Sequence, residues 1–232
     1  MGSDHLYSIV IPVYRSEAYL AATVRELLAF FEQRSPVEVI LVNDGSPDGV
    51  QRVIDDLCAG DPRVRGLSLD KNLGQHRATL LGLRETRGDV VVTIDDDAQN
   101  PPSAALAVAE TLEREGLDVV YGTFQPSGQS WSRRAATAVN LWVSKRTLPN
   151  KRAITLTNVR GLRGDFARKL ASIDAPNPYI EAMIFRMTNR IGEAPVDHRP
   201  RASGKSGYTL CKLLALSYAH LTTTRTNQGG DT

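Results

Sequence analysis

The stretch Gly88–Ala105, GDVVVTIDDDAQNPPSAA, determines how the rest of this sequence is interpreted. Its apolar run ends at three consecutive aspartates, Asp95, Asp96 and Asp97, and two prolines follow after three more residues. Adjacent carboxylates repel one another, so the triplet is unfavourable unless a cation, or a ligand that carries one, lies among the three. The pattern predicts a buried strand that ends at a ligand site, although one or two of the aspartates could instead serve as a helix-capping turn before Pro102.

Strand-like and helix-like segments alternate along the first 122 residues. Short connections between such segments favour parallel strand pairing through right-handed crossovers. Nearly continuous apolar runs are typical of strands that are covered on both faces. The expected fold class is therefore α/β, with a mostly parallel central sheet flanked by helices. The expected strands are 6–13, 37–42, 64–69, 89–94 and 118–122.

Polar segments follow the first four expected strands. In parallel sheets of this kind, ligands bind outside the carboxyl ends of the strands. We therefore expect these segments to converge on one edge of the sheet. The segments are 14–17, 43–48, 70–75 and 95–100.

Composition limits the classes of function. A chain of 232 residues, 41% of them hydrophobic, suits one large domain or two small ones, and no linker divides it. The net charge is +2, from 28 Lys and Arg against 26 Asp and Glu, and it gives no reason to expect nucleic-acid binding.

The compartment is also constrained by the sequence. Cys58 and Cys211 are far apart in helix-like segments, so we expect no disulfide framework and a reducing cytosol. Asp4 and His5 interrupt the N-terminus before any apolar stretch, which argues against a signal peptide. No run approaches the roughly 20 apolar residues of a membrane span. The final residues, 226–232, are expected to be disordered.

Several motifs have a plain and a functional interpretation. NDGSPD (43–48) is either a simple turn or a site where Asp44 accepts a base N–H. DHRPRASGKSG (197–207) is either a solvated basic loop or a mobile lid that closes on phosphates. The apolar stripe of 210–221 belongs either to a helix packed on the core or to an interfacial helix on anionic lipid. His76 is interpreted as a satisfied residue at a helix start rather than a catalyst.

Three other phosphate-binding classes are excluded. GKS lacks the upstream glycine of a P-loop, since that position holds Arg199. No G-x-G-x-x-G follows the first strand, which excludes the common dinucleotide site. An aspartyl phosphatase would need its D-x-D after the first strand rather than the fourth.

Four stretches together resemble the inverting family 2 glycosyltransferases of the GT-A fold. Within that family the sequence is most similar to the polyprenyl-phosphate branch, which includes dolichol-phosphate mannosyltransferases and undecaprenyl-phosphate aminoarabinose transferases. The resemblance covers residues 6 to about 222. The stretches are SIVIPVYRSEAYL, VILVNDGSPD, NLGQHRATLLGLRETRGDVVVTIDDDAQNPP and HRPRASGKSGYTLCKLL.

The resemblance implies one GT-A domain over 1–225, with a nucleotide-binding half (1–122) and an acceptor and lid half (123–225). It implies transfer of a sugar from a UDP-, GDP- or dTDP-sugar to a polyprenyl phosphate, with Mg²⁺ or Mn²⁺. Such an enzyme would face the cytosol, with a peripheral contact at the membrane.

The resemblance also assigns roles to individual residues. Asp95 and Asp97 match the family's D-x-D, with Asp95 toward the ribose or phosphate, Asp97 on the metal and Asp96 between them. The metal ligands implied are Asp95, Asp97 and His198. The nucleotide-binding residues implied are Pro12, Tyr14, Glu17, Asp44, Asp95, Asp96, Lys205 and Ser206. The catalytic residues expected are Asp97, Arg199, Arg201 and Glu181.

One departure from the family bears on the acceptor. Some relatives carry an aspartate, a candidate base, shortly before the pair that Leu162 and Arg163 resemble, whereas this chain reads ITLTNVRGLR. A phosphate acceptor is mostly dianionic at pH 7 and needs no base, so the departure favours a lipid phosphate. Glu181 is the alternative base toward a hydroxyl acceptor, or else a surface helix residue. The competing functions are a soluble glycosyltransferase that modifies a hydroxyl and a non-catalytic nucleotide-sugar binding module.

Overall fold

The fold is described for residues 5–124 and 154–199 of a computed structural model. These residues belong to one compact unit. That one domain extends over residues 1–225 remains a prediction for the residues outside these ranges.

All five predicted strands form, and each end lies within two residues of the prediction. Apolar and β-branched residues fill them almost without interruption, and most of their residues are buried. The strands in the described residues are β1 (Tyr7–Val13), β2 (Val37–Asn43), β3 (Val64–Ser68), β4 (Val90–Thr93), β5 (Val119–Phe124), β6 (Arg160–Arg163) and β7 (Ile191–Val196).

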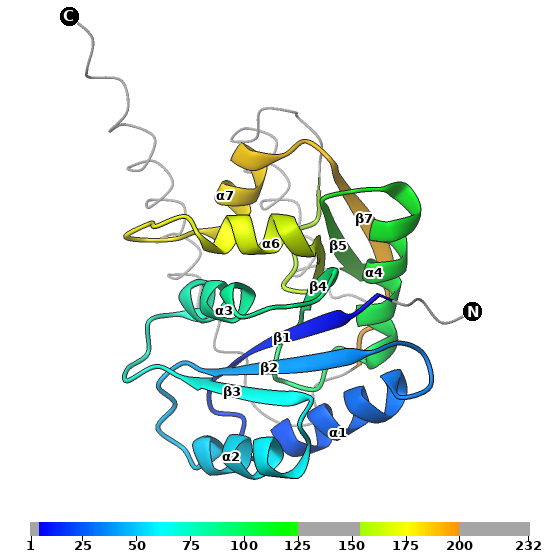
Figure 1. Cartoon of the computed structure of the whole chain (residues 1–232). Coiled ribbons are helices and arrows are strands. Elements are labelled where there is room, and N and C mark those ends of the chain that lie inside the picture. Colours follow the sequence, from blue (N-terminus) through cyan, green and yellow to red (C-terminus); the bar gives the residue numbers. More distant parts are fainter. Residues whose placement is uncertain (1–4, 125–153, 200–232) are drawn as a thin grey trace, which may run out of the picture. The chain divides into compact units, whose positions relative to one another are not determined.

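Helices connect and follow these strands (Figure 1). The predicted helix near Pro102 begins at that proline, which the first turn tolerates, and ends at Gly116 in the left-handed conformation. The described helices are α1 (Leu20–Phe31), α2 (Val50–Gly60), α3 (Gln75–Arg84), α4 (Pro102–Glu115), α6 (Gly164–Ala171) and α7 (Ile180–Met187).

The strand order in the sheet is β3-β2-β1-β4-β6-β5-β7. The pairs β1–β2, β1–β4, β2–β3 and β5–β7 are parallel, as predicted for the first half of the chain. Strand β6 lies between β4 and β5 and is antiparallel to both, which the periodicity of the sequence did not predict. The five predicted strands still run in one direction, so their carboxyl ends share one edge.

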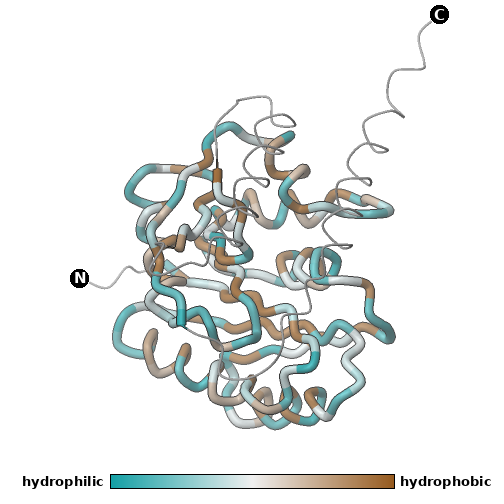
Figure 2. Tube along the Cα trace, turned by 180° about the vertical axis from the view of Figure 1, so that it is seen from behind, coloured by the Kyte–Doolittle hydropathy of each residue, from teal (hydrophilic) through white to brown (hydrophobic). Residues whose placement is uncertain are grey.

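Two apolar layers cover the sheet, and alternate residues of each strand face opposite layers. Ile9 and Ile11 of β1 pack with α1, α2 and α4, whereas Val10 packs with α3, α6 and α7. Figure 2 shows the apolar strands inside and polar residues along the outer loops. Within the described part of the chain, no helix is long and apolar enough to cross a membrane.

Candidate functional site

The carboxyl edge of the sheet gathers the polar segments predicted to meet there. The loops after β1, β2 and β4 contact one another through Tyr14, Asp44 and Asp96. Strand β7 ends at the same edge, because Val196 pairs with Phe124 at the end of β5. Strand β6 begins there, because Arg160 pairs with Thr93 at the end of β4.

The three aspartates of the triplet have different partners. Asp95 accepts hydrogen bonds from Gln75 Nε2 at Oδ1 (2.7 Å) and from Asn158 Nδ2 at Oδ2 (3.3 Å). Asp96 Oδ2 accepts the backbone N–H of Tyr14 (2.8 Å). Asp97 Oδ1 accepts the N–H of Gln99 (3.2 Å) in a local turn.

The electrostatics of the triplet favour a cation. Burial raises the pKa of Asp95, and the charge of Asp97 raises it further against the hydrogen bonds that lower it. Burial also raises the pKa of Asp96 to about 6. Three carboxylates at one edge therefore retain mutual repulsion that the surrounding amides only partly offset.

The backbone around the triplet is strained. Ala98 has φ of 59° and Arg15 has φ of 58°, and these are the two non-glycine residues with positive φ in 5–124 and 154–199. Both stand in loops at the carboxyl edge. Such conformations are unfavourable for residues with a side chain and are often found at binding sites.

The predicted metal site is only partly assembled from side chains. Within the described ranges, no three His, Cys, Asp or Glu side chains lie close enough to hold an ion. The imidazole of His198 instead packs edge-on against Phe124, with ring centroids 4.4 Å apart. The metal roles of Asp95, Asp97 and His198 therefore stay predictions, and the remaining ligands would have to come from substrate or water.

Asp44 lies beneath the loop that precedes α3. It is 3% exposed, and its carboxylate accepts the N–H groups of Leu73 (2.7 Å) and Gly74 (3.0 Å). Burial raises its pKa even though these two bonds oppose the shift. The contact fixes the loop between β3 and α3, while the predicted contact of Asp44 with a base stays a prediction.

Residues after β1 border the same space. Pro12 is buried at the end of β1 beside Val42 of β2, and Tyr14 is exposed at the edge. Glu17 accepts the N–H of Gly49 at the start of α2 (2.9 Å), and so joins the first two loops. Their predicted role at the nucleotide remains untested.

The predicted lid begins beside the triplet. Arg199 N donates to Gln99 O (2.8 Å), and Gln99 Nε2 donates to Arg199 O (3.3 Å). The guanidinium of Arg199 is directed to Glu26 on α1, with two bonds of 2.7 and 2.9 Å. Its predicted contact with a diphosphate would require that pair to open. Arg201, Lys205 and Ser206 lie outside the described residues.

Glu181 is buried, so the interpretation as a surface helix residue is wrong. It is 6% exposed, and its Oε1 lies 3.2 Å from Nη1 of the equally buried Arg160. Its Oε2 lies 3.8 Å from Nδ1 of His76, whose ring packs against Tyr179. Burial lowers the pKa of His76 more than Glu181 raises it.

Sequence reasoning missed Gln75, Asn158 and Arg160 as members of this site. Gln75 was part of the GQH string but had no assigned role, and Asn158 was noted only where an aspartate was absent. Arg160 could have been noticed from the sequence, because it is a charged residue next to the apolar residues Val159 and Leu162. A buried charge needs a partner, so that position deserved a search for a carboxylate.

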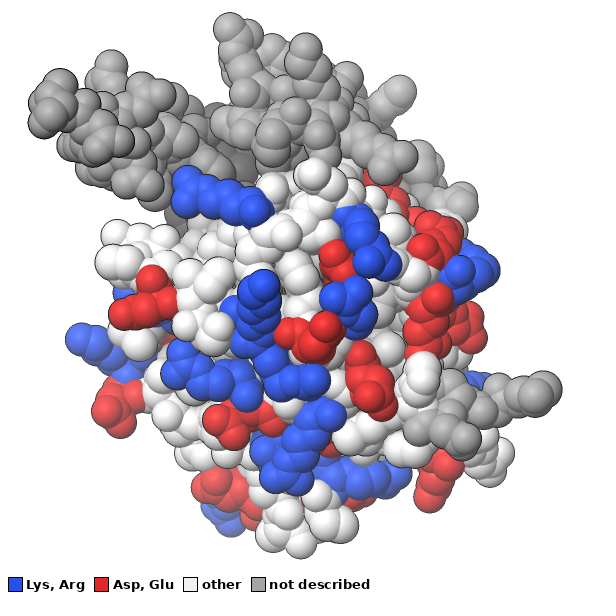
Figure 3. All heavy atoms as spheres, turned by 45° about the horizontal axis from the view of Figure 1, so that its top comes forward, with Lys and Arg blue, Asp and Glu red and all other residues white. Residues whose placement is uncertain are grey.

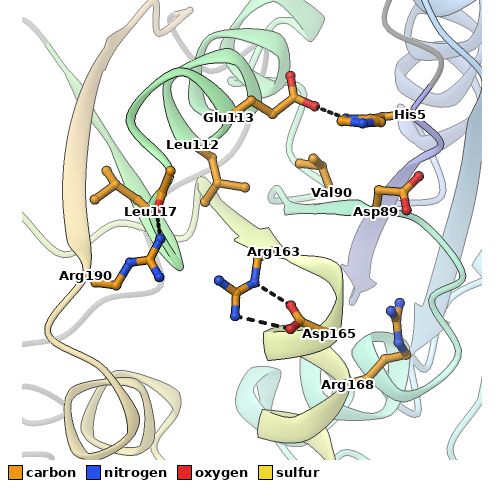
Figure 4. A pocket seen from close by; sticks show the side chains of 11 residues that line it. His5, Asp89, Val90, Leu112, Glu113, Leu117, Arg163, Asp165, Arg168 and Arg190 are labelled. Carbon is orange, nitrogen blue, oxygen red and sulfur yellow. Dashed lines mark hydrogen bonds and ion pairs between the residues drawn. The ribbon is translucent and has the colours of Figure 1, made fainter.

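A cavity of about 440 Å³ lies at the opposite, amino edge of the sheet (Figure 4). Several of its charged side chains are paired: Arg163 with Asp165 (2.6 Å) and Asp118 (2.7 Å), and Glu113 with His5 (2.6 Å). The acidic triplet does not line this cavity, so the cavity is separate from the candidate site.

An acidic triplet lies at the carboxyl edge of this α/β sheet, beside Arg199, and the sequence matches a family model. Residues 8–167 match the family described as Glycosyl transferase family 2. The chain belongs to this family.

Curated relatives extend well beyond this chain in length. An undecaprenyl-phosphate 4-deoxy-4-formamido-L-arabinose transferase from Aeromonas hydrophila is 35% identical over 221 residues, which are 92% of this chain and 66% of that protein. The enzyme of the same name from Edwardsiella ictaluri is 31% identical over 214 residues, 91% of this chain and 65% of that protein. This chain thus spans just under two thirds of their length.

Solved structures share the fold at low identity. The glucosyl-3-phosphoglycerate synthase of Mycobacterium tuberculosis, in complex with Mn²⁺, UDP and phosphoglyceric acid, has a TM-score of 0.70 at 19% identity. The match covers 98% of this chain and 80% of that one. A Pyrobaculum calidifontis mannosyltransferase in complex with GDP-mannose and Mn²⁺ has a TM-score of 0.65 at 18% identity, over 99% and 66% of the two chains.

Proposed function

We propose that this chain transfers a sugar from a nucleotide diphosphate to a polyprenyl phosphate at the cytosolic face of a membrane. The observation that carries the proposal is the pair Asp95 and Asp97 at the end of β4, beside the start of the basic segment at Arg199. The names of the curated relatives support the polyprenyl-phosphate acceptor.

The donor set suits Mg²⁺ or Mn²⁺. Both are hard cations that bind one or two carboxylates and take further oxygens from substrate phosphates and water. Asp95 and Asp97 would supply the carboxylates, and their mutual repulsion would be relieved by the ion. The bound ion would neutralise charge that develops on the departing nucleoside diphosphate.

The chain's own residues would orient the reactants. Gln75 and Asn158 hold Asp95 from two sides, so that carboxylate cannot rotate freely. Arg199, once released from Glu26, would add a bidentate cation at the diphosphate. A phosphate acceptor arrives ionised, so the transfer needs no protein base.

The proposed peripheral membrane contact is supported by one surface of the described residues. Arg84 Nη2 donates to Ala171 O, and Arg168 Nη1 donates to Gly88 O (3.1 Å each). Two of four exposed cations are thus fixed by backbone carbonyls, and none of the four forms an ion pair within the described ranges. Figure 3 shows Lys and Arg on one face of the molecule with Asp and Glu distributed among them. We call the four cations the α3–α6 basic surface: Arg84, Arg87, Arg168 and Lys169. The predicted interfacial helix at 210–221 lies outside the described residues.

Two assays test the proposed function. Thermal unfolding with UDP-, GDP- and dTDP-sugars, each with and without Mn²⁺, should show one nucleotide class that raises the melting temperature only with the metal. Radiolabelled sugar should then pass to a polyprenyl phosphate and not to the corresponding polyprenol. Transfer to the alcohol would instead support the hydroxyl-directed alternative, and metal-dependent binding with no transfer to either would support the binding module.

A further inference from the structure

A chain of polar contacts runs from the acidic triplet into the protein. Asp95 Oδ2 accepts Asn158 Nδ2 (3.3 Å), and Asn158 Oδ1 in turn accepts Nη2 of Arg160 (3.3 Å). Nη1 of Arg160 lies 3.2 Å from Oε1 of Glu181. The carboxylate at the ligand edge is therefore connected, through one amide and one guanidinium, to a second carboxylate in the core.

The contacts return to the triplet by a second route. Oε2 of Glu181 lies 3.8 Å from Nδ1 of His76. The neighbouring residue, Gln75, donates to the other oxygen of Asp95 at 2.7 Å. The two amides that hold Asp95 are thus both linked to Glu181: Asn158, which lies just before β6, through Arg160, and Gln75, at the start of α3, through the neighbouring His76.

Stability alone does not explain the ion pair at the centre of these contacts. The side chains of Arg160 and Glu181 are 3% and 8% exposed, and replacing a buried ion pair by apolar residues is often neutral or stabilising. Among the described residues, Arg160 Nε and Nη1 and Glu181 Oε2 also have no hydrogen-bond partner, so Nη1 meets Glu181 as an ion pair without hydrogen-bond geometry. The pair is therefore not arranged to make the largest number of bonds.

The geometry instead explains the orientation of Asn158. A guanidinium only donates hydrogen bonds, so the amide oxygen of Asn158 must face Arg160. The amide nitrogen then faces Asp95, which is an acceptor. Without Arg160 the amide could rotate and present its oxygen to the carboxylate, which would push Asp95 away.

We propose that Arg160 and Glu181 are positioning residues, a buried ion pair that fixes Asp95 for ligand binding by orienting Asn158. The expected effect of this ion pair on metal and nucleotide binding rests on the proposed function. The contacts among Asp95, Asn158, Arg160 and Glu181, which we call the ring, do not. The proposal gives Glu181 a role different from that of a general base, because it acts through Arg160 rather than on an acceptor.

The first test examines the ring without any ligand. In the full chain labelled with ¹⁵N, the side-chain amide signals of Gln75 and Asn158 are assigned and compared between wild type and Arg160→Met. We expect the Asn158 signal to shift strongly. The matched control is Arg163→Gln, which removes an arginine from the other end of β6, where it pairs with Asp118 and Asp165, and should leave both amides in place. An unmoved Asn158 amide in Arg160→Met would overturn the proposal.

The second test measures consequences for binding. Calorimetric titration with Mn²⁺ and the nucleoside diphosphate that stabilises the wild type should show at least about 10-fold weaker binding for Arg160→Met, as expected for partners of metal ligands. The double variant Arg160→Met/Asn158→Ala should lose little more than Asn158→Ala alone, because the two residues act in series. If the losses of affinity in the two single variants add up in the double variant, the two residues act independently and the proposed order of contacts is contradicted. If the wild type binds no nucleotide, the proposed function is refuted. The amide signals would still show whether Arg160 orients Asn158.

The third test separates positioning from base catalysis at Glu181. Glutamine keeps a side-chain oxygen facing Arg160, so Glu181→Gln should keep kcat within about 3-fold of wild type, whereas Glu181→Ala should weaken nucleotide binding as Arg160→Met does. A general base would give the opposite pattern, with Glu181→Gln losing at least about 100-fold in kcat while nucleotide affinity stays unchanged. That result, together with loss of the acidic limb of the pH profile, would refute the positioning role.

Discussion

Substituting Gly45 by alanine tests how closely two loops of the site must approach. Gly45 follows Asp44 and has φ of +59°, a conformation that residues with a side chain rarely adopt. A Cβ atom there would lie 2.3 Å from the carbonyl carbon of Lys71 and 2.5 Å from the nitrogen of Asn72. Both atoms belong to backbone, so no side-chain rotation can relieve the overlap.

The expected loss of stability has two parts. The left-handed conformation costs an L-residue about 1–2 kcal/mol. The overlap must move the 71–74 loop, which Asp44 holds by two buried hydrogen bonds, and overpacking of this kind costs about 1–3 kcal/mol. We therefore expect Gly45→Ala to lower the free energy of unfolding by about 2–5 kcal/mol, a large part of a typical total.

Urea unfolding of the full chain measures this difference. The matched control is Gly60→Ala at the end of α2, where an added Cβ meets no atom within 4 Å and φ is not positive. That variant should stay within about 1 kcal/mol of wild type. If Gly45→Ala unfolds at the same urea concentration as Gly60→Ala, the close approach of the two loops is not a constraint and the description of this edge is wrong.

Three further predictions concern charge at the site and its surroundings. Asp97→Ala should keep the fold, shown by an unchanged far-UV spectrum, yet lose about 10²- to 10³-fold in metal-dependent transfer; unchanged transfer would remove the metal role. Glu26→Gln should release Arg199 and, because the ion pair is half exposed, change the free energy of unfolding by less than about 1 kcal/mol. It should also tighten nucleoside diphosphate binding, measured by titration calorimetry at low salt. Weaker binding would show that the ion pair supports the site instead. Arg84→Gln/Arg168→Gln should lower the affinity for anionic phospholipid vesicles, measured by sedimentation, about 30-fold, at about 1 kcal/mol per cation. The control Arg25→Gln/Arg52→Gln, on α1 and α2, should bind as the wild type does. An equal loss in both variants would indicate that net charge, and not this surface, governs binding.

The first half of the fold was predictable because its physical signals are local. Continuous apolar runs, helical spacing and turn residues gave the five strands to within two residues at each end, and the parallel direction followed from the alternation with helices. The edge that carries the ligand site followed from the same direction, since the carboxyl ends of parallel strands lie together.

The second half was not predictable because β6 has little signal of its own. Its four residues, Arg160–Arg163, contain two arginines and a glycine, and only pairing with β4 and β5 makes them a strand. Non-local pairing overrides the weak local preference of so short a segment. The partner of Arg199 was missed for a similar reason, because Glu26 lies 173 residues away on an amphipathic helix whose exposed face gave no hint of a contact.

The reversed direction of β6 is what brings the residues just before it into the site. In a sheet of parallel strands alone, the residues that reach the carboxyl edge are those that follow a strand. Because β6 is antiparallel to its neighbours, the residues that precede it reach that edge instead, and they include Asn158. The same reversal puts Arg160, the first residue of β6, beside Thr93 at the end of β4. One short strand in the opposite direction thus supplies both the amide that holds Asp95 and the cation that orients the amide.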